Sequence, residues 1–497
     1  MNAIDWHQRA RNTSFRVGDL IDGKTSDPEG DQFIHKYAAH DGTLLYSFKE
    51  GANKTVNQAV QSARQAFTDG RWRNKTVYER QAVLNKLADL LEENREQFAL
   101  YECLDVGKPI SAALEEDVFS ASANLRKAAS GLGVLLMPSG VRGNDMAYQH
   151  RKPIGVVVGI IGWNFPLVLA TAKIGPALAM GNSVVIKPSE FTALSALRLA
   201  QLALEAGVPP GVLNIVQGAG STVGAALASH MDVDMITFTG STQTGKRIMA
   251  AAALSNMKRV HLECGGKSPY LVFDDCPEDL DWMAHQVVAS AFPNQGALCI
   301  SSTRLLVQAG IKDALLEKIV KHTQKIKPQD PLNPDTRFGA IMNEAHMQKV
   351  LGYVESGKAE GATYLCGGEQ VLQETGGFYL TPAIFDQVKP EHRIAREEIF
   401  GPLLSTLTFN NEEEALQLAN NSDYGLAAYV ATTNLSRAHR VAQNLNAGLV
   451  IVSGSTDAPT EYVDLGMEPH RQSGMGYEDG IEGLEAFSVT SAIHMGI

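Results

Sequence analysis

The sequence predicts an α/β protein built on parallel sheets, and three observations lead to this class. Hydrophobic residues make up 44% and charged residues 20% of the 497 residues, a balance typical of folded globular chains. Residues 55–100 place apolar side chains three and four positions apart, which indicates amphipathic helices. Over residues 154–253, short apolar runs alternate with helical patterns, as in strand–helix–strand units.

Four strand–turn–helix units follow one another in that second region. Their apolar runs end in polar or glycine-containing turns, in GVVVGIIGWNFP, NSVVIKPSE, LNIVQGAGS and DMITFTGST. Parallel strands bring their carboxyl ends to one edge of the sheet, where ligands bind, so these turns are the expected binding edge. A second alternating region over residues 267–458 predicts a second α/β domain.

Charge and hydropathy exclude several classes of protein. The formal net charge is −12 without a basic stripe, which argues against nucleic-acid binding. The first fifteen residues lack an apolar stretch, so no secretory signal is expected. The apolar segment Gly155–Gly181 is interrupted by Asn164, Pro166 and Lys173, and therefore predicts a buried strand, turn and helix, not a membrane span.

The chain has an odd number of cysteines and no C-x-x-C pair. Neither a disulfide framework nor a zinc site is expected, and a reducing, cytoplasmic location fits. Each thiol can therefore be considered as a nucleophile: Cys103, Cys264, Cys276, Cys299 and Cys366.

Cys299 is the candidate nucleophile with the most suitable surroundings. It follows a polar turn of Asn294, Gln295 and Gly296 and precedes a predicted strand. A thiol at such a turn is open to approach, and nearby backbone N–H groups would lower its pKa. Taken alone, a cysteine is more often a small buried apolar residue.

Glu263 and Asn164 are candidate partners for this thiol. Glu263 lies beside a Gly-Gly pair just before an apolar strand, where it could act as a general base or be a solvated loop residue. Asn164 follows a strand, where its amide could donate to an oxyanion or cap the next helix.

Six motifs occur together in one order: WNFP, KPSE, FTGST-x-x-G-K, E-x-GGK-S, NQG-x-x-C and EEIFGP. In this order and spacing the chain resembles the aldehyde dehydrogenase superfamily over nearly its whole length. It is most similar to the NAD-dependent, non-acylating branch, and within it to aminoaldehyde and γ-glutamylaminobutyraldehyde dehydrogenases.

The resemblance implies oxidation of an aldehyde to a carboxylic acid through a thioester on Cys299. Asn164 and the backbone N–H of Cys299 would hold the oxyanion, and Glu263 would activate the hydrolytic water. Lys173 resembles a position that assists proton relay, although a lysine there could equally be a helix surface charge.

The resemblance also implies NAD as the cofactor. Glu190 could accept hydrogen bonds from the adenine-ribose hydroxyls, and its charge would repel the 2′-phosphate of NADP. Lys187 and Ser189 belong to the same turn, in which Ser189 could also be a helix N-cap. The remaining expected cofactor residues are Trp163, Gly220, Gly240, Ser241, Gly245, Glu398 and Phe400.

The substrate assignment depends on acids at the expected tunnel mouth. Asp117 and Asp457, with acidic neighbours Glu115, Glu116, Glu461 and Asp464, would favour a cationic amino- or guanidino-aldehyde if they point inward. Solvated acidic surfaces and a neutral aliphatic or aromatic aldehyde are the alternatives. Phe165 is expected to line the tunnel. The chain departs from the family pattern at Ala172, Cys264, Pro293 and Tyr477.

The expected organisation is an NAD-binding domain (1–126 and 153–262), a catalytic domain (263–481) and a small β bridging element (127–152 and 482–497). The alternating tail SVTSAIHM predicts a strand that pairs with another subunit, in a homodimer or homotetramer. A coenzyme A-acylating dehydrogenase and a non-catalytic NAD-binding scaffold are the rival functions.

Overall fold

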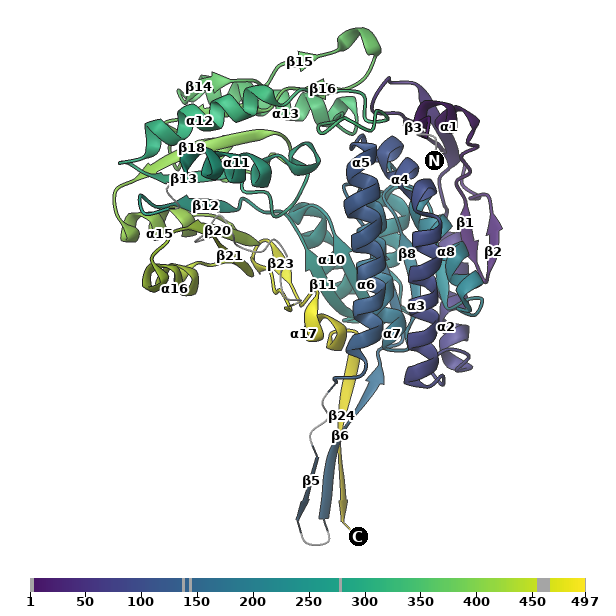
Figure 1. The fold of residues 1–497 in the computed structure, drawn as a ribbon. Helices are drawn as coiled ribbons and strands as arrows, with labels where there is room; N and C mark the ends of the chain where they lie inside the picture. Colours follow the sequence, from purple (N-terminus) through teal and green to yellow (C-terminus); the bar gives the residue numbers. More distant parts are fainter. Residues whose placement is uncertain (1–3, 136–138, 143–144, 277–278, 454–464, 497) are drawn as a thin grey trace.

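The computed structural model describes residues 4–135, 139–142, 145–276, 279–453 and 465–496. Figure 1 shows two α/β bodies side by side and a narrow β element that extends away from them. Each body is built on one large, mostly parallel sheet. The predicted α/β class with parallel sheets is therefore confirmed.

The first sheet has the strand order β2-β1-β9-β8-β7-β10-β11-β23. Its central strands β8, β7 and β10 are parallel, and β7 and β8 are buried along their whole length because both sheet faces are covered by helices. The strands span Asp19–Ile21 (β1), Lys24–Ser26 (β2), Val156–Ile160 (β7), Ser183–Lys187 (β8), Leu213–Ile215 (β9), Met235–Thr239 (β10), Arg259–Glu263 (β11) and Gly474–Met475 (β23).

The four predicted strand–turn–helix units all occur in this body. Their helices are α7 (Pro166–Ala179), α8 (Leu194–Ala206), α9 (Ala225–Ser229) and α10 (Thr242–Leu254). Four N-terminal helices pack beside them: α2 (Asn53–Thr68), α3 (Val77–Glu93), α4 (Arg95–Val106) and α6 (Val118–Gly131). No helix within the described ranges is long and apolar enough to cross a membrane.

The second sheet has the order β14-β17-β18-β13-β12-β20-β21, and β14 is its one antiparallel member. Its strands are β12 (Pro269–Val272), β13 (Arg304–Gln308), β14 (Thr363–Cys366), β17 (Ala383–Asp386), β18 (Leu403–Phe409), β20 (Ala427–Ala431) and β21 (Leu449–Ser453). The flanking helices are α11 (Leu280–Ala291), α12 (Lys312–Lys325), α13 (Glu344–Ala359), α15 (Glu412–Asn420) and α16 (Leu435–Asn444).

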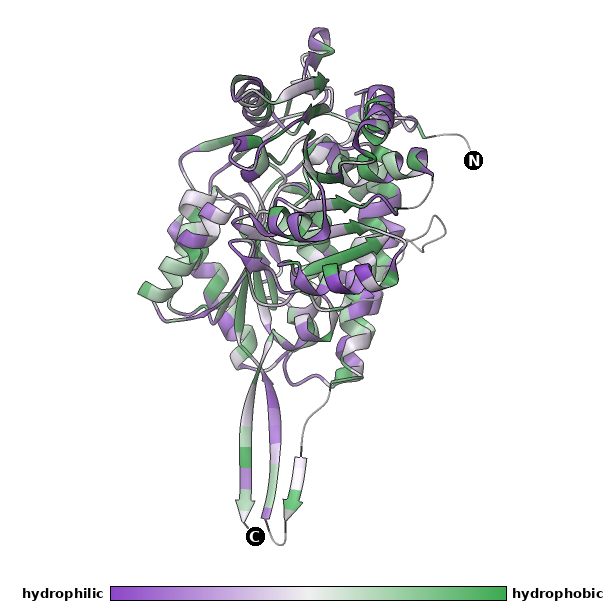
Figure 2. Cartoon of the chain, turned by 90° about the vertical axis from the view of Figure 1, so that its left-hand side faces the viewer, coloured by the Kyte–Doolittle hydropathy of each residue, from purple (hydrophilic) through white to green (hydrophobic). Residues whose placement is uncertain are grey.

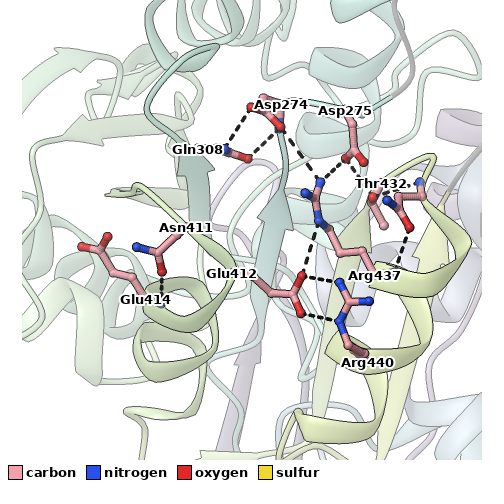
Figure 3. A network of polar contacts seen from close by, with 10 residues as sticks. Asp274, Asp275, Gln308, Asn411, Glu412, Glu414, Thr432, Arg437 and Arg440 are labelled. Carbon is pink, nitrogen blue, oxygen red and sulfur yellow. Dashed lines mark hydrogen bonds and ion pairs between the residues drawn. The ribbon is translucent and has the colours of Figure 1, made fainter.

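An ion-pair network joins α15 and α16 to the end of β12 (Figure 3). Arg437 lies 2.7 Å from Asp275, and Glu412 accepts two hydrogen bonds from Arg440. The network holds α15 and α16 against the segment that follows β12.

The third sheet is the narrow element, in the order β24-β6-β5. β24 (Ser488–Gly496) pairs antiparallel with β6 (Asp145–Pro153), and β5 (Ser139–Arg142) completes the sheet. Hydrophilic and hydrophobic residues are mixed along the projecting strands, and β6 has a continuous hydrophilic stretch (Figure 2). β5, β6 and β24 thus form one element, whereas residues 127–131 belong to α6 and Gly480–Glu485 form a short helix, α17.

Candidate active site

A cavity of about 710 Å³ contains the candidate reactive residues. We call it the main cavity. Cys299, Glu263 and Asn164 all border it, although they come from three separate segments of the chain. Glu263 is the last residue of β11, and Asn164 lies between β7 and α7, so both are at the carboxyl ends of parallel strands.

The turn before Cys299 has an unusual backbone. Asn294, Gln295 and Gly296 have φ angles of 48°, 57° and 76°, three successive left-handed residues. A side chain at Gly296 would also approach the Gly401 carbonyl carbon to 2.4 Å, so glycine is required there. Asn294 Nδ2 donates to the Asn164 carbonyl at 3.0 Å, which ties this turn to the Asn164 segment.

Asn164 faces the cysteine turn and does not cap the helix. The N-cap of α7 is Phe165, with no side-chain cap, so the capping alternative is wrong. The Asn164 side chain is buried, and its Nδ2 donates to the Ala297 carbonyl at 3.0 Å. An amide nitrogen carries two hydrogens, so one bond fixes the group and leaves a second N–H for the cavity.

The expectation of a lowered pKa for the Cys299 thiol is wrong. Burial, followed by the charges of Glu263, Glu398 and Glu478, raises the pKa of Cys299 to about 12. The Ile300 backbone acts in the opposite direction and is the smallest contribution. The thiol is partly exposed, as predicted, but three carboxylates around it disfavour the thiolate.

Glu263 belongs to a buried cluster of charges. It is 8% exposed, so the solvated-loop alternative is wrong. Burial, followed by Glu478, raises its pKa well above the ordinary value, while Lys173 opposes the shift. Lys173 is 2% exposed and lies 2.8 Å from Glu478, so it is not a helix surface charge.

Glu478 is the residue of this cluster that sequence reasoning left without a role. It exchanges two backbone hydrogen bonds with Met467 and follows β23, which joins the first sheet beside β11. The acidic residue in the GMGYED segment was the available signal, but its meeting with Lys173 depends on this remote strand pairing.

The far end of the main cavity is bordered by Glu398 and an aromatic group. Glu398 accepts a hydrogen bond from the Gly266 N–H at 3.0 Å, and a side chain at Gly265 would strike its carboxylate. Trp163 lies edge-on to Phe400 at 5.4 Å between ring centroids. His346, which was not among the expected residues, contacts both rings and lies 2.7 Å from the Phe400 carbonyl.

The KPSE turn brings a buried lysine and a carboxylate together. Lys187 Nζ lies 2.9 Å from Glu190, and the Gly220 backbone also interacts with that carboxylate. Burial acts to raise the pKa of Glu190, but these contacts lower it below the ordinary value. Ser189 accepts from the Phe191 N–H, whereas α8 begins at Leu194, so the helix N-cap alternative is wrong.

The residues of the glycine-containing turn and helix start after β10 have different roles. Gly240 and Ser241 border the main cavity, and Ser241 caps α10 by accepting from the Thr244 N–H. Gly245 is a packing residue, since a side chain there would approach the Cys264 sulfur to 2.7 Å. Cys264 thus fills the contact between α10 and the end of β11, and it too borders the main cavity.

The mouth of the main cavity combines apolar and acidic side chains. Phe165 borders it, and Lys108 Nζ lies 3.9 Å from the centre of the Phe165 ring. Asp117 is 2% exposed and forms an ion pair with Lys108, so a cation within the protein already matches its charge. Glu116 also borders the cavity and is exposed. Asp457, with Glu461 and Asp464, lies outside the described residues.

None of the five cysteines, all of which are described, forms a disulfide. The chain is 43% identical over 450 residues to "NADP/NAD-dependent aldehyde dehydrogenase PuuC" of Escherichia coli K12, covering 90% of this chain and 89% of that protein. A γ-glutamyl-γ-aminobutyraldehyde dehydrogenase structure from Burkholderia cenocepacia J2315 is 41% identical, with a TM-score of 0.95 and 99% of both chains covered.

A third relative has been solved with ligands. A variant of P. syringae AldA indole-3-acetaldehyde dehydrogenase, in complex with NAD+ and IAA, is 42% identical, with a TM-score of 0.96 and 99% of both chains covered. The profile of the aldehyde dehydrogenase family matches residues 26–493. This chain therefore belongs to the aldehyde dehydrogenase family.

Proposed function

We propose that this enzyme oxidises an aldehyde to a carboxylic acid with NAD, through a thioester on Cys299 that Glu263-activated water hydrolyses. The observation that carries the proposal is the convergence of Cys299, Glu263 and Asn164 on one cavity from three segments. A thiol, a carboxylate and a side-chain amide are the groups that nucleophilic attack, water activation and oxyanion binding require.

In the first half-reaction the Cys299 thiolate adds to the aldehyde carbon and forms a thiohemiacetal. The Asn164 amide, held by the Ala297 carbonyl, and the Cys299 backbone N–H would stabilise the oxyanion. In the second half-reaction Glu263 takes a proton from water, whose oxygen attacks the thioester carbon. Glu478, which forms an ion pair with Lys173 near Glu263, would accept that proton in turn on its carboxylate.

The residues present fit an NAD molecule along the main cavity and beyond it. Glu190 and Gly220 would hold the adenosine end, Gly240 and Ser241 at the start of α10 would face the phosphates, and Trp163, Glu398 and Phe400 would hold the nicotinamide end. NAD, when bound, would accept the hydride that the former aldehyde carbon loses as the thiohemiacetal becomes the thioester.

Cofactor preference gives a direct test of Glu190. Because Lys187 partly neutralises it, this carboxylate should disfavour NADP without excluding it, in keeping with a relative named for both cofactors. In Glu190→Gln we expect the ratio of kcat/KM with NADP to that with NAD to rise about tenfold, since Lys187 would then face the 2′-phosphate alone. Initial rates with both cofactors measure it, and an unchanged ratio would place Glu190 away from the ribose.

We further propose an amino- or guanidino-aldehyde as the substrate. Glu116 at the cavity mouth offers an exposed negative charge, and relatives include a γ-glutamyl-γ-aminobutyraldehyde dehydrogenase. A neutral aldehyde is the second candidate, because Lys108 already pairs with Asp117 and because a relative is an indole-3-acetaldehyde dehydrogenase. A preference for cationic aldehydes would therefore depend on the exposed acids of this cavity, Glu116 and Asp479.

An aldehyde panel distinguishes these substrates, with NADH absorbance as the readout. The panel pairs aminoaldehydes with neutral aldehydes of matched length. In Glu116→Gln, KM for aminoaldehydes should rise about fivefold, or roughly 1 kcal/mol, while neutral aldehydes are unaffected. Glu115→Gln is the matched control, since Glu115 does not border the main cavity. Equal use of neutral aldehydes by the parent enzyme would reject the cationic substrate.

The same assays address the rival functions. Free acid formed without coenzyme A would exclude the acylating reaction as the main activity, and NADH formation would exclude a non-catalytic scaffold. We also propose a homodimer or homotetramer, because β24 is a nine-residue strand at the edge of its sheet. We propose the cytoplasm as its location, because none of the five cysteines forms a disulfide.

A further inference from the structure

Glu50 contacts the turn that follows β9, residues 219–222. Its Oε1 accepts a hydrogen bond from the Ala219 N–H at 3.3 Å and another from the Thr222 hydroxyl. Glu50 directly follows β4 (Leu44–Lys49), and Ala219 lies 169 positions later in the chain. A carboxylate from a remote segment therefore binds the 219–222 turn at both of its ends.

The backbone around Glu50 is itself held in place. The Glu50 N–H donates to the Gln32 carbonyl at 2.7 Å, and the Glu50 carbonyl accepts from the Gly30 N–H at 2.8 Å. The next residue, Gly51, donates to the Gln217 carbonyl at 3.2 Å, and a side chain at Gly51 would approach that oxygen to 2.3 Å. The two segments are thus in direct backbone contact, which keeps the Glu50 carboxylate beside the turn.

The same turn also faces Glu190. The Gly220 backbone N–H interacts with the Glu190 carboxylate, so the successive N–H groups of Ala219 and Gly220 are bound by two different carboxylates. Glu50 also acts electrostatically on Lys187, the ion-pair partner of Glu190. Glu50 and Glu190 therefore lie near one another, with the 219–222 turn in contact with both.

The outer side of the 219–222 turn is open. Gly220, Ser221 and Thr222 are exposed. A side chain added at Gly220 would meet no atom of the described residues within 4 Å. Because this open space adjoins the N–H that contacts Glu190, one ligand can reach the Gly220 backbone and the Glu190 carboxylate together.

We propose that Glu50 is a positioning residue for NAD, which holds the 219–222 turn in the conformation that receives the adenosine ribose. This inference rests on the proposed place of the adenosine end at Glu190 and Gly220. When the ribose hydroxyls donate to Glu190, that carboxylate shares its acceptor sites between the ribose and Gly220. The bonds from Glu50 do not depend on the ribose, so they keep the turn in place. A turn that is already ordered loses less conformational freedom on binding, which strengthens the affinity.

Two substitutions at Glu50 separate its hydrogen bonds from its charge. Glu50→Ala removes both bonds, whereas Glu50→Gln keeps an oxygen that can accept them and removes the charge. Thr222→Val removes the hydroxyl partner at an exposed residue, and it tests the same contact if Glu50→Ala fails to fold. Glu29→Ala is the matched control, because Glu29 is an exposed acid of the same region whose carboxylate lies 2.7 Å from Lys54.

Calorimetry without aldehyde measures the Kd of NAD and of adenosine diphosphate ribose (ADP-ribose), which lacks the nicotinamide. In Glu50→Ala we expect both Kd values to rise by the same factor, about tenfold, the usual effect of losing a charge-assisted hydrogen bond. Thr222→Val should raise both about threefold, and Glu50→Gln should stay within about threefold of the parent. Glu29→Ala should bind both ligands like the parent.

Turnover gives a second readout. At saturating NAD, kcat should stay within about twofold of the parent in Glu50→Ala, because the lost contact stabilises the ground state and the transition state equally. Parent-like Kd values in folded Glu50→Ala would overturn the inference. Binding as weak in Glu50→Gln as in Glu50→Ala would also overturn it, since the charge and not the held turn would then matter.

Glu190→Gln distinguishes failure of this inference from failure of the proposed cofactor site. If Glu190→Gln weakens ADP-ribose binding and Glu50→Ala does not, the role of Glu50 alone is rejected. If neither variant changes the Kd of ADP-ribose, the adenosine end binds elsewhere, and both proposals are rejected. A parent enzyme that binds NAD but oxidises no aldehyde would reject the proposed reaction, while the binding data would still decide the role of Glu50.

Discussion

Cys299→Ala should abolish aldehyde oxidation, with a fall in kcat of at least about 10⁴-fold. Two thiols, Cys264 and Cys299, border the main cavity within the described ranges, and Cys299 is the one that follows the turn contacted by the Asn164 amide. Removing an enzyme's nucleophile typically costs this much or more. Alanine is close in size to cysteine, so the fold should be retained. Initial rates of NADH formation on the preferred aldehyde measure the loss.

The controls separate chemistry from folding and binding. Cys366→Ala removes another partly exposed thiol that does not border the main cavity and should keep the parent rate. The Kd of NAD for Cys299→Ala should differ from that of the parent enzyme by less than about twofold. It can be measured by quenching of tryptophan fluorescence, since Trp163 lies in the cavity wall. If Cys299→Ala kept more than about one hundredth of the parent rate, a covalent intermediate on this residue would be untenable.

The sheet of the first body could be predicted from local pattern alone. Its strands are short apolar runs, and each is followed by a polar turn and a helix with regular apolar spacing, so neighbouring residues define every unit. The residues at which helices begin were harder to predict. Ser189 is a residue type common at helix N-caps, but it forms a tight turn five residues before α8. Turn conformation depends on contacts that the local sequence does not specify.

The reactive residues could be predicted because polar side chains at the ends of parallel strands meet at one sheet edge. Glu263 ends β11 and Asn164 follows β7, and these two strands lie on either side of β10. The glycine-containing turn before Cys299 contacts the Asn164 segment and so brings the thiol close to it. Their burial could not be predicted. Lys173 and Glu478 are 305 positions apart, and the short pairing of β23 with β11 contributes to bringing them together.

The pKa of the Cys299 thiol also could not be predicted from the local sequence. A turn rich in backbone N–H groups predicts a stabilised thiolate, and the Ile300 backbone does act in that direction. Burial and the carboxylates of Glu263, Glu398 and Glu478 outweigh it. Two of these carboxylates lie far along the chain from Cys299, so their effect is a property of the assembled site and not of the local motif.

Glu263→Gln should uncouple the two half-reactions. Glutamine keeps the shape of the side chain but cannot take a proton from water, so NADH should form in a burst of about one equivalent and then nearly stop. We expect kcat to fall about 100- to 10,000-fold, the usual contribution of general base catalysis. Rapid mixing gives the burst, and intact mass spectrometry should detect the acyl group on Cys299. A parent-like steady state would show that another group activates the water.

The pH dependence of hydrolysis provides a second signature of the same residue. Burial and Glu478 raise the pKa of Glu263 above its ordinary value, so the protonated form persists to higher pH than for an exposed glutamate. Because only the carboxylate can act as the base, the rate of deacylation should rise with pH through that raised pKa and then level off. Substituting Glu478 by glutamine removes the nearby negative charge, so the rise should move to lower pH. The Glu263→Gln variant should lose the rise altogether, which would assign the titration to this carboxyl group and not to the thiol.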